Sequence, residues 1–239
     1  HRDLHSFPTR RSSDLVVEPG THLDWYRGPT LMAQLEATPD TSRADAGGFR
    51  FPVQYVCRPH GDFRGYMGRI EGGALAVGDE VIALPSGRRS QVVDIQHHGQ
   101  SLAAADHGQP VTLLLADDID LSRGDMLVRP GNEPGIFIRL RADVCWLAET
   151  PLDLRRSYLL RHTTREVRAR VEALHCRLDL HALQRESCSG LGLNDIGELT
   201  LRLSQPVFAD AYGDNRNTGA FILIDEATNN TVGAGIILE

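Results

Sequence analysis

Turn residues recur about every ten residues from Phe51 onward, and this spacing restricts the possible folds more than any other feature. Segments 77–79 and 85–87 are two such turns. Between turns, apolar and polar side chains alternate, as in strands that bury one face. The first segment predicts four side chains on one face: Phe51, Val53, Tyr55 and Cys57. Many short strands joined by close turns indicate a small closed β-barrel.

A second series of the same kind follows residues 129–134, a stretch rich in Gly and Pro that suggests a domain boundary. Within it, residues 166–178 alternate in the way that predicts a half-buried strand. Residues 180–185 are expected to hold a single helical turn. The sequence therefore predicts an all-β fold of two consecutive antiparallel β-barrels, over residues 49–131 and 132–239.

The N-terminal region differs from both series. Residues 1–15 show no hydrophobic periodicity and resemble the conceptual translation of a sequencing-library adapter joined to a truncated gene. A basic N-terminal arm is the alternative interpretation. Residues 16–48 are expected to form a short linker helix and a polar linker, with Pro29 in the first turn of the helix and its end near Ala37. On this interpretation the chain is the C-terminal part of a longer protein.

The absence of lysine limits the chemistry of this chain, since all 25 basic side chains are arginine. A P-loop needs a lysine whose ammonium group contacts the β- and γ-phosphates, and the guanine-recognising motif Asn-Lys-x-Asp needs one too. Neither motif can be present here. We therefore expect no catalytic residue and no nucleotide cofactor site within this chain.

Other classes of site also lack a signature. The four cysteines are scattered without a Cys-x-x-Cys pair, which favours reduced, buried thiols over a zinc site. His97 and His98 are neighbours in a predicted strand, so we expect them on opposite faces and a poor chelate. The net charge of −7 argues against nucleic acid as a partner, and no run of about 20 apolar residues could span a membrane.

Longer motifs support a family resemblance that covers residues 24–239. Two general blocks, at residues 77–87 (VGDEVIALPSG) and 117–125 (DDIDLSRGD), are typical of second domains in translation-factor GTPases. Three more particular blocks lie at residues 25–31 (WYRGPTL), 50–56 (RFPVQYV) and 215–225 (NRNTGAFILID). Together they resemble the large, GTPase subunit of bacterial sulfate adenylyltransferase.

This resemblance implies a cytoplasmic heterodimer that joins ATP and sulfate into adenylyl sulfate and pyrophosphate for sulfate assimilation and cysteine biosynthesis. In that family the small subunit carries the adenylyl transfer, and the large subunit hydrolyses GTP with Mg²⁺ in a G domain. This chain lacks the G domain, so the resemblance implies a non-catalytic scaffold. Its expected partners are the small catalytic subunit and its own G domain.

Four residues are candidates for such an interface. Asp62 and Arg64 belong to a loop of the first barrel that, in translation GTPases, faces the G domain or an RNA end. Asn215 and Arg216 precede a predicted strand and either pair within the barrel or meet the partner subunit. Two alternatives remain open: barrels that bind RNA or tRNA, as in an elongation factor, and the middle of a bifunctional protein with a C-terminal adenylyl-sulfate kinase.

Overall fold

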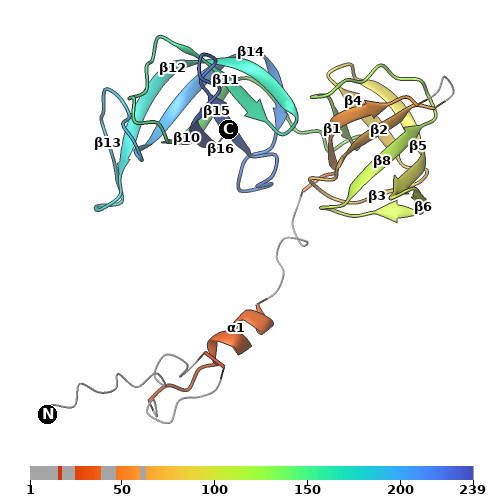
Figure 1. The fold of residues 1–239 in the computed structure, drawn as a ribbon, viewed down its shortest axis with the longest axis horizontal. Coiled ribbons are helices and arrows are strands. Elements are labelled where there is room, and N and C mark those ends of the chain that lie inside the picture. Colours follow the sequence, from red (N-terminus) through yellow and green to blue (C-terminus); the bar gives the residue numbers. More distant parts are fainter. Residues whose placement is uncertain (1–15, 18–24, 39–46, 60–62, 239) are drawn as a thin grey trace, which may run out of the picture. The chain divides into compact units, whose positions relative to one another are not determined.

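A computed structural model describes residues 16–17, 25–38, 47–59 and 63–238 (Figure 1). The interpretation of residues 1–15 as an adapter and the candidate Asp62 therefore lie outside the described residues. The chain divides into two compact units, His1–Ala44 and Asp45–Glu239. Each is considered by itself.

The first unit contains one short helix, α1 (Leu31–Ala37). Thr30 caps its N-terminus, where the Thr30 Oγ1 accepts a hydrogen bond from the Ala33 amide at 3.2 Å. Pro29 therefore precedes the cap and does not lie in the first turn. No residue of α1 is buried. Within the described residues, no helix is long and apolar enough to cross a membrane.

The first barrel occupies the part of the second unit between Arg50 and Val128. Six antiparallel strands form the ring in the order β4-β9-β1-β2-β8-β5, and β5 pairs back with β4 to close it. The ring strands are β1 (Arg50–Cys57), β2 (Gly65–Arg69), β4 (Glu80–Leu84), β5 (Arg88–His97), β8 (Pro110–Leu115) and β9 (Met126–Val128). Three short strands lie outside the ring: β3 (Leu75–Ala76), β6 (Gln100–Leu102) and β7 (Ala104–Ala105).

The alternation in β1 is interrupted, which makes one sequence prediction wrong. The pairing register of β1 with β2 shifts between Val53 and Tyr55, as in a β-bulge. A bulge adds one residue and moves the following side chains to the other face. Phe51 and Val53 are fully buried, but Tyr55 is 61% exposed, and Val56 packs against the core instead.

The second barrel closes in the same way. Its ring order is β11-β15-β16-β10-β14-β12, and β12 pairs with β11. The strands are β10 (Gly135–Trp146), β11 (Ser157–His162), β12 (Arg165–Asp179), β14 (Ile196–Ala209), β15 (Ala220–Ile224) and β16 (Thr231–Ile237), with β13 (Gln184–Glu186) outside the ring. Trp146 anchors the core, donating from Nε1 to the Thr150 carbonyl and meeting the Tyr158 ring edge-on. The predicted all-β fold of two antiparallel barrels is confirmed.

Two local expectations fail at hairpin turns. Residues 180–185 do not form a helical turn: residues 180–183 are a turn and Gln184 starts β13, while Asp179 Oδ1 accepts from the His181 amide at 2.8 Å. At the β5–β6 turn, His98 and Gly99 both have positive φ, as in a type I′ turn. This conformation brings the rings of His97 and His98 to 4.2 Å, so they do not lie on opposite faces.

Candidate functional site

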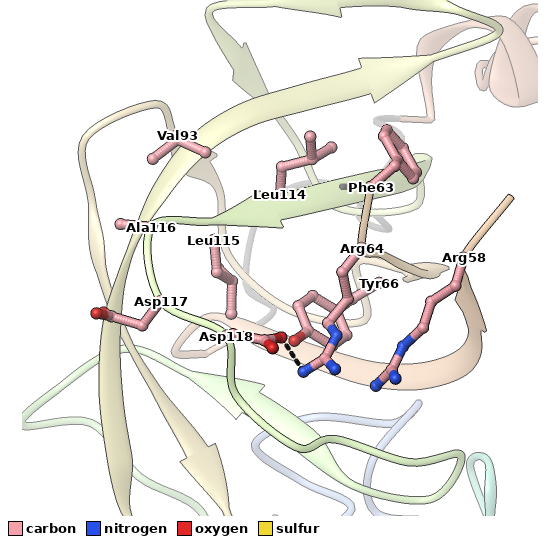
Figure 2. A pocket seen from close by; sticks show the side chains of 10 residues that line it. All are labelled: Arg58, Phe63, Arg64, Tyr66, Val93, Leu114, Leu115, Ala116, Asp117 and Asp118. Atoms are coloured by element: carbon pink, nitrogen blue, oxygen red, sulfur yellow. Dashed lines mark ion pairs between the residues drawn. The ribbon is translucent and has the colours of Figure 1, made fainter. Parts of the chain in front are cut away.

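The first barrel carries an open groove of about 600 Å³ between the residues after β1 and the end of β8 (Figure 2). Its walls combine apolar side chains with two arginines and two aspartates. The lining residues are Arg58, Phe63, Arg64, Tyr66, Val93, Leu114, Leu115, Ala116, Asp117 and Asp118. The groove therefore contains Arg64, one of the candidates from the sequence.

Arg64 is fixed from two sides. Its guanidinium forms an ion pair with the Asp118 carboxylate, and Nη1 donates to the Ile119 carbonyl at 3.1 Å. The Tyr66 hydroxyl donates to the same Ile119 carbonyl. The Arg64 side chain is 23% exposed, whereas that of Asp118 is 74% exposed. The arginine is thus held in the wall, and its carboxylate partner reaches in from solvent.

The other arginine and the other aspartate behave differently. The Arg58 guanidinium extends toward the same end of the groove as that of Arg64 (Figure 2). Among the described residues, no hydrogen bond or ion pair engages Arg58. Asp117 points away from both arginines, because its Oδ2 accepts from Ser90 Oγ at 2.7 Å and its amide donates to the same hydroxyl at 3.1 Å.

Burial raises the pKa of the Tyr66 hydroxyl, and this effect exceeds the lowering by the neighbouring Arg64 and Arg58 charges. Tyr66 therefore stays a neutral hydrogen-bond donor at physiological pH. Among the lining residues that the structure describes, this side of the groove carries the charges of the two arginines and of Asp118, so a ligand would meet a cationic end beside an apolar wall.

Asn215 lies at a second location, where the barrels meet. It is 4% exposed, and its Nδ2 donates to the Glu71 carbonyl of the first barrel at 3.0 Å. Its Oδ1 accepts from the amides of Asn217 and Thr218, which shapes the loop before β15. Arg216 beside it is exposed. Of the two, only Arg216 presents its side chain to solvent.

The residues that complete this junction were missed by sequence reasoning. Arg50 of the first barrel is buried and forms a two-point ion pair with Asp210 of the second. Thr218 Oγ1 donates to the same carboxylate at 2.5 Å, and the buried His162 donates from Nε2 to the Thr218 carbonyl. Arg50 and Thr218 belong to recognised motif blocks, but nothing in either block indicates a contact between them.

Apolar contacts support the same junction. Phe208 of the second barrel packs in one buried cluster with four side chains of the first barrel: Ile82, Leu84, Met126 and Val128. Arg165 lies over the Phe208 ring, 5.4 Å from its centroid, and donates to the Gly124 carbonyl across the junction. The barrels are therefore joined by a buried core as well as by polar bonds.

No metal centre is apparent within the described residues, which contain no group of three or more His, Cys, Asp or Glu side chains arranged to hold an ion. His175 bonds to Thr200 Oγ1, and the Asp179 carboxylate accepts from the His181 amide in the turn after β12. All four cysteines are free and partly buried.

Known proteins are similar to this chain in sequence and in fold. Residues 139–238 match the family of GTP-eEF1A C-terminal domain-like domains. Sulfate adenylyltransferase subunit 1 of Vibrio vulnificus (strain YJ016) is 44% identical over 226 residues, which are 95% of this chain and 48% of that protein. The subunit 1 of Laribacter hongkongensis is 44% identical over 229 residues, 94% of this chain and 47% of that protein.

This chain is a homologue of sulfate adenylyltransferase subunit 1. It spans about half the length of these curated relatives. The bifunctional enzyme CysN/CysC of Mycobacterium tuberculosis (strain ATCC 25618 / H37Rv) is 41% identical over 245 residues, 100% of this chain and 40% of that protein. Homology to subunit 1 confirms the resemblance found in the sequence motifs.

Solved structures agree on the architecture. Two structures of sup35, one with GMPPNP and one with GDP, match 95% of this chain and 56% of their own, with TM-scores of 0.74 and 0.75. The sequence identities are only 19% and 20%, so these matches show the fold alone.

Proposed function

We propose that this chain is the two-barrel scaffold of the GTPase subunit of sulfate adenylyltransferase, an enzyme of sulfate assimilation. The observation that carries the proposal is the 44% identity to subunit 1 relatives over nearly the whole chain. The role is to bind the small catalytic subunit and to pass on conformational changes of the G domain. The chain itself performs no catalytic step.

The junction between the barrels suits a scaffold. The contacts of Arg50 with Asp210 and of Asn215 with Glu71 tie the barrels together through buried groups. A pair of domains joined in this way presents one surface to a partner and passes on a displacement without bending. Arg64 and Arg216, on separate barrels, are the candidate partner contacts that the structure describes.

GTP and Mg²⁺ belong to the proposed activity of a full-length parent. The sequence does not fit GTP, and the residues that the structure describes do not fit Mg²⁺. Lysine is absent from the sequence, so no P-loop can form, and the described residues contain no cluster suited to a metal ion. We therefore assign no step of GTP hydrolysis or adenylyl transfer to residues of this chain.

The proposal is tested by co-expressing the chain with the sulfate adenylyltransferase small subunit from the same genome. The two should co-purify, and Arg64→Glu or Arg216→Glu should weaken the complex, whereas Arg89→Glu on an exposed strand should not. The reading frame extended upstream to include a G domain should form adenylyl sulfate faster with GTP than without it. Failure to co-purify, together with no effect of GTP, would remove the proposal.

The same experiments separate the alternatives. Single-function and bifunctional relatives match at 44% and 41% identity, so identity does not decide whether a kinase domain follows in the parent. The genomic sequence downstream of Glu239 decides that question. For RNA-binding barrels, a filter-binding assay should give an affinity that falls steeply with salt.

A further inference from the structure

The groove of the first barrel (Figure 2) carries charged side chains next to apolar ones. Two guanidinium groups, from Arg58 and Arg64, extend toward one end of it, beside the Tyr66 hydroxyl. Only Arg64 is neutralised by a carboxylate among the described residues. Arginine presents its donors as a planar fork that matches the oxygens of carboxylate, phosphate or sulfate. This end of the groove is therefore prepared for an anion.

The existing partner of Arg64 is suited to being replaced. The Asp118 carboxylate is 74% exposed, so the ion pair lies largely in water, where such pairs contribute little to stability. Arg64 also donates to the Ile119 carbonyl, a backbone contact that does not involve the Asp118 side chain. An incoming anion could thus take the place of Asp118 without disturbing the position of the arginine.

The groove also has an apolar wall. Phe63, Leu114 and Leu115 line it together with the Val93 side chain. An inorganic ion would leave this surface in contact with water. A ligand that carries an apolar or planar body next to its anionic group would cover the surface and gain affinity from that burial.

We propose that the groove binds an organic oxyanion, a phosphate or sulfate ester, whose charged group bridges Arg58 and Arg64 and displaces Asp118. Two arginine forks offer more donors than the two oxygens of one carboxylate can accept, which favours a group with three free oxygens. The apolar body of the ester lies along Phe63 and Leu115. This inference concerns a small ligand and does not rest on the proposed function.

The test is a titration of the 239-residue chain in chloride buffer, followed by ¹H–¹⁵N NMR of the arginine Nε–H groups and of the amides at residues 114–119. The probes are inorganic phosphate, inorganic sulfate, adenosine 5′-monophosphate and 4-nitrophenyl sulfate. Both esters should bind about tenfold more tightly than the corresponding inorganic ion, since the apolar wall adds to their affinity. The relative affinities of inorganic phosphate and inorganic sulfate, which carry no organic body, distinguish a preference for phosphate from one for sulfate.

Matched variants assign the effect to the groove. Arg58→Gln should weaken ester binding about tenfold, as expected for the loss of a charge-assisted bond. Arg155→Gln removes one exposed positive charge from the other barrel and should leave binding unchanged. Asp118→Asn should tighten binding severalfold, whereas Asp120→Asn, on the same loop and with the same change in net charge, should not. All four positions are exposed, so the variants should fold.

Equal weakening by Arg58→Gln and Arg155→Gln would show that only net charge matters and would overturn the proposal. So would shifts confined to residues outside the groove, or inorganic ions that bind as tightly as the esters. Neither result would bear on co-purification with the small subunit, so the two proposals can fail independently.

Discussion

Arg50 and Asp210 lie 160 positions apart in the chain and form a two-point ion pair that joins the barrels. Arg50 Nε donates to Asp210 Oδ2 at 2.9 Å, and Nη2 donates to Oδ1 at 2.7 Å. The remaining Nη1 donates to the carbonyls of Phe49 and Asn132. Because Arg50 is only 3% exposed, these bonds replace the water that the guanidinium loses on folding.

We expect Arg50→Ala to reduce the free energy of unfolding by about 3 kcal/mol, because removing one member of a buried pair leaves its partner uncompensated. Urea denaturation monitored by tryptophan fluorescence measures the change. Arg89→Ala is the control, since the Arg89–Glu80 pair is exposed on both sides and should contribute less than about 1 kcal/mol. Equal losses from the two variants would contradict a structural role for the junction.

Gly72→Ala should loosen the same junction by a steric route. A Cβ at this position would lie 2.6 Å from the Gly48 carbonyl oxygen and 2.9 Å from Asn215 Nδ2. The backbone cannot give way cheaply, so we expect a loss of about 2 kcal/mol in thermal or urea unfolding. At Gly47 a Cβ would meet nothing within 4 Å, so Gly47→Ala should be close to neutral. A neutral Gly72→Ala would show that the loop can move aside.

Substitutions at the adjacent Asn215 and Arg216 should have different effects, the first on stability and the second on binding of the partner subunit. Asn215→Ala leaves the Glu71 carbonyl and two amides without their partner and should cost about 2 kcal/mol of unfolding free energy. Arg216→Ala changes an exposed side chain and should stay within about 0.5 kcal/mol of the parent chain. In a pull-down with the small subunit, the second variant should show the larger specific effect. The reverse pattern would exclude Arg216 as a partner contact.

His162 should make the stability of the second barrel depend on pH. Burial lowers its pKa below the ordinary value near 6.5, an effect only partly offset by the bond to the Thr218 carbonyl and the charge of Asp210. The unfolded chain therefore binds more protons as the pH falls below about 6.5. The free energy of unfolding should therefore have its full value above that pH. It should decrease on acidification, by at most about 1.4 kcal/mol per pH unit for this group.

Unfolding free energies between pH 7.5 and 5 measure this dependence. His162→Gln should flatten the curve in that range, and His175→Gln, which changes an exposed histidine, should retain it. A His162→Gln variant with the parental slope would assign the effect to another group.

The fold could be predicted from the sequence where apolar and polar side chains alternate in step with their burial. Val167 and Ala169 are buried and alternate with the exposed Arg168 and Arg170, as the pattern of this strand predicts. The prediction failed at Tyr55 because a bulge is a property of two paired strands, and the pattern of one strand does not record it. It failed at His98 because the positive φ of the turn rotates a side chain out of the alternation.

The contacts of the candidate site could be predicted less well from the sequence, for a related reason. Arg64 was identified by its loop, and the structure places it in the groove with Asp118, a contact that no spacing in the sequence indicates. Asn215 was identified within a motif, yet its contact with Glu71 spans 144 positions and depends on how two closed rings meet. A contact between these residues and a partner stays a prediction.

Closure of both rings also affects how this chain behaves at high concentration. A strand with one unpaired side is a template on which another chain can add by backbone hydrogen bonds, the first step of many fibrils. Here each described ring strand has a hydrogen-bonded neighbour on both sides along at least part of its length. Among the described strands, those outside the rings are two or three residues long: β3, β6, β7 and β13. Such short segments offer too few backbone groups to nucleate a growing sheet.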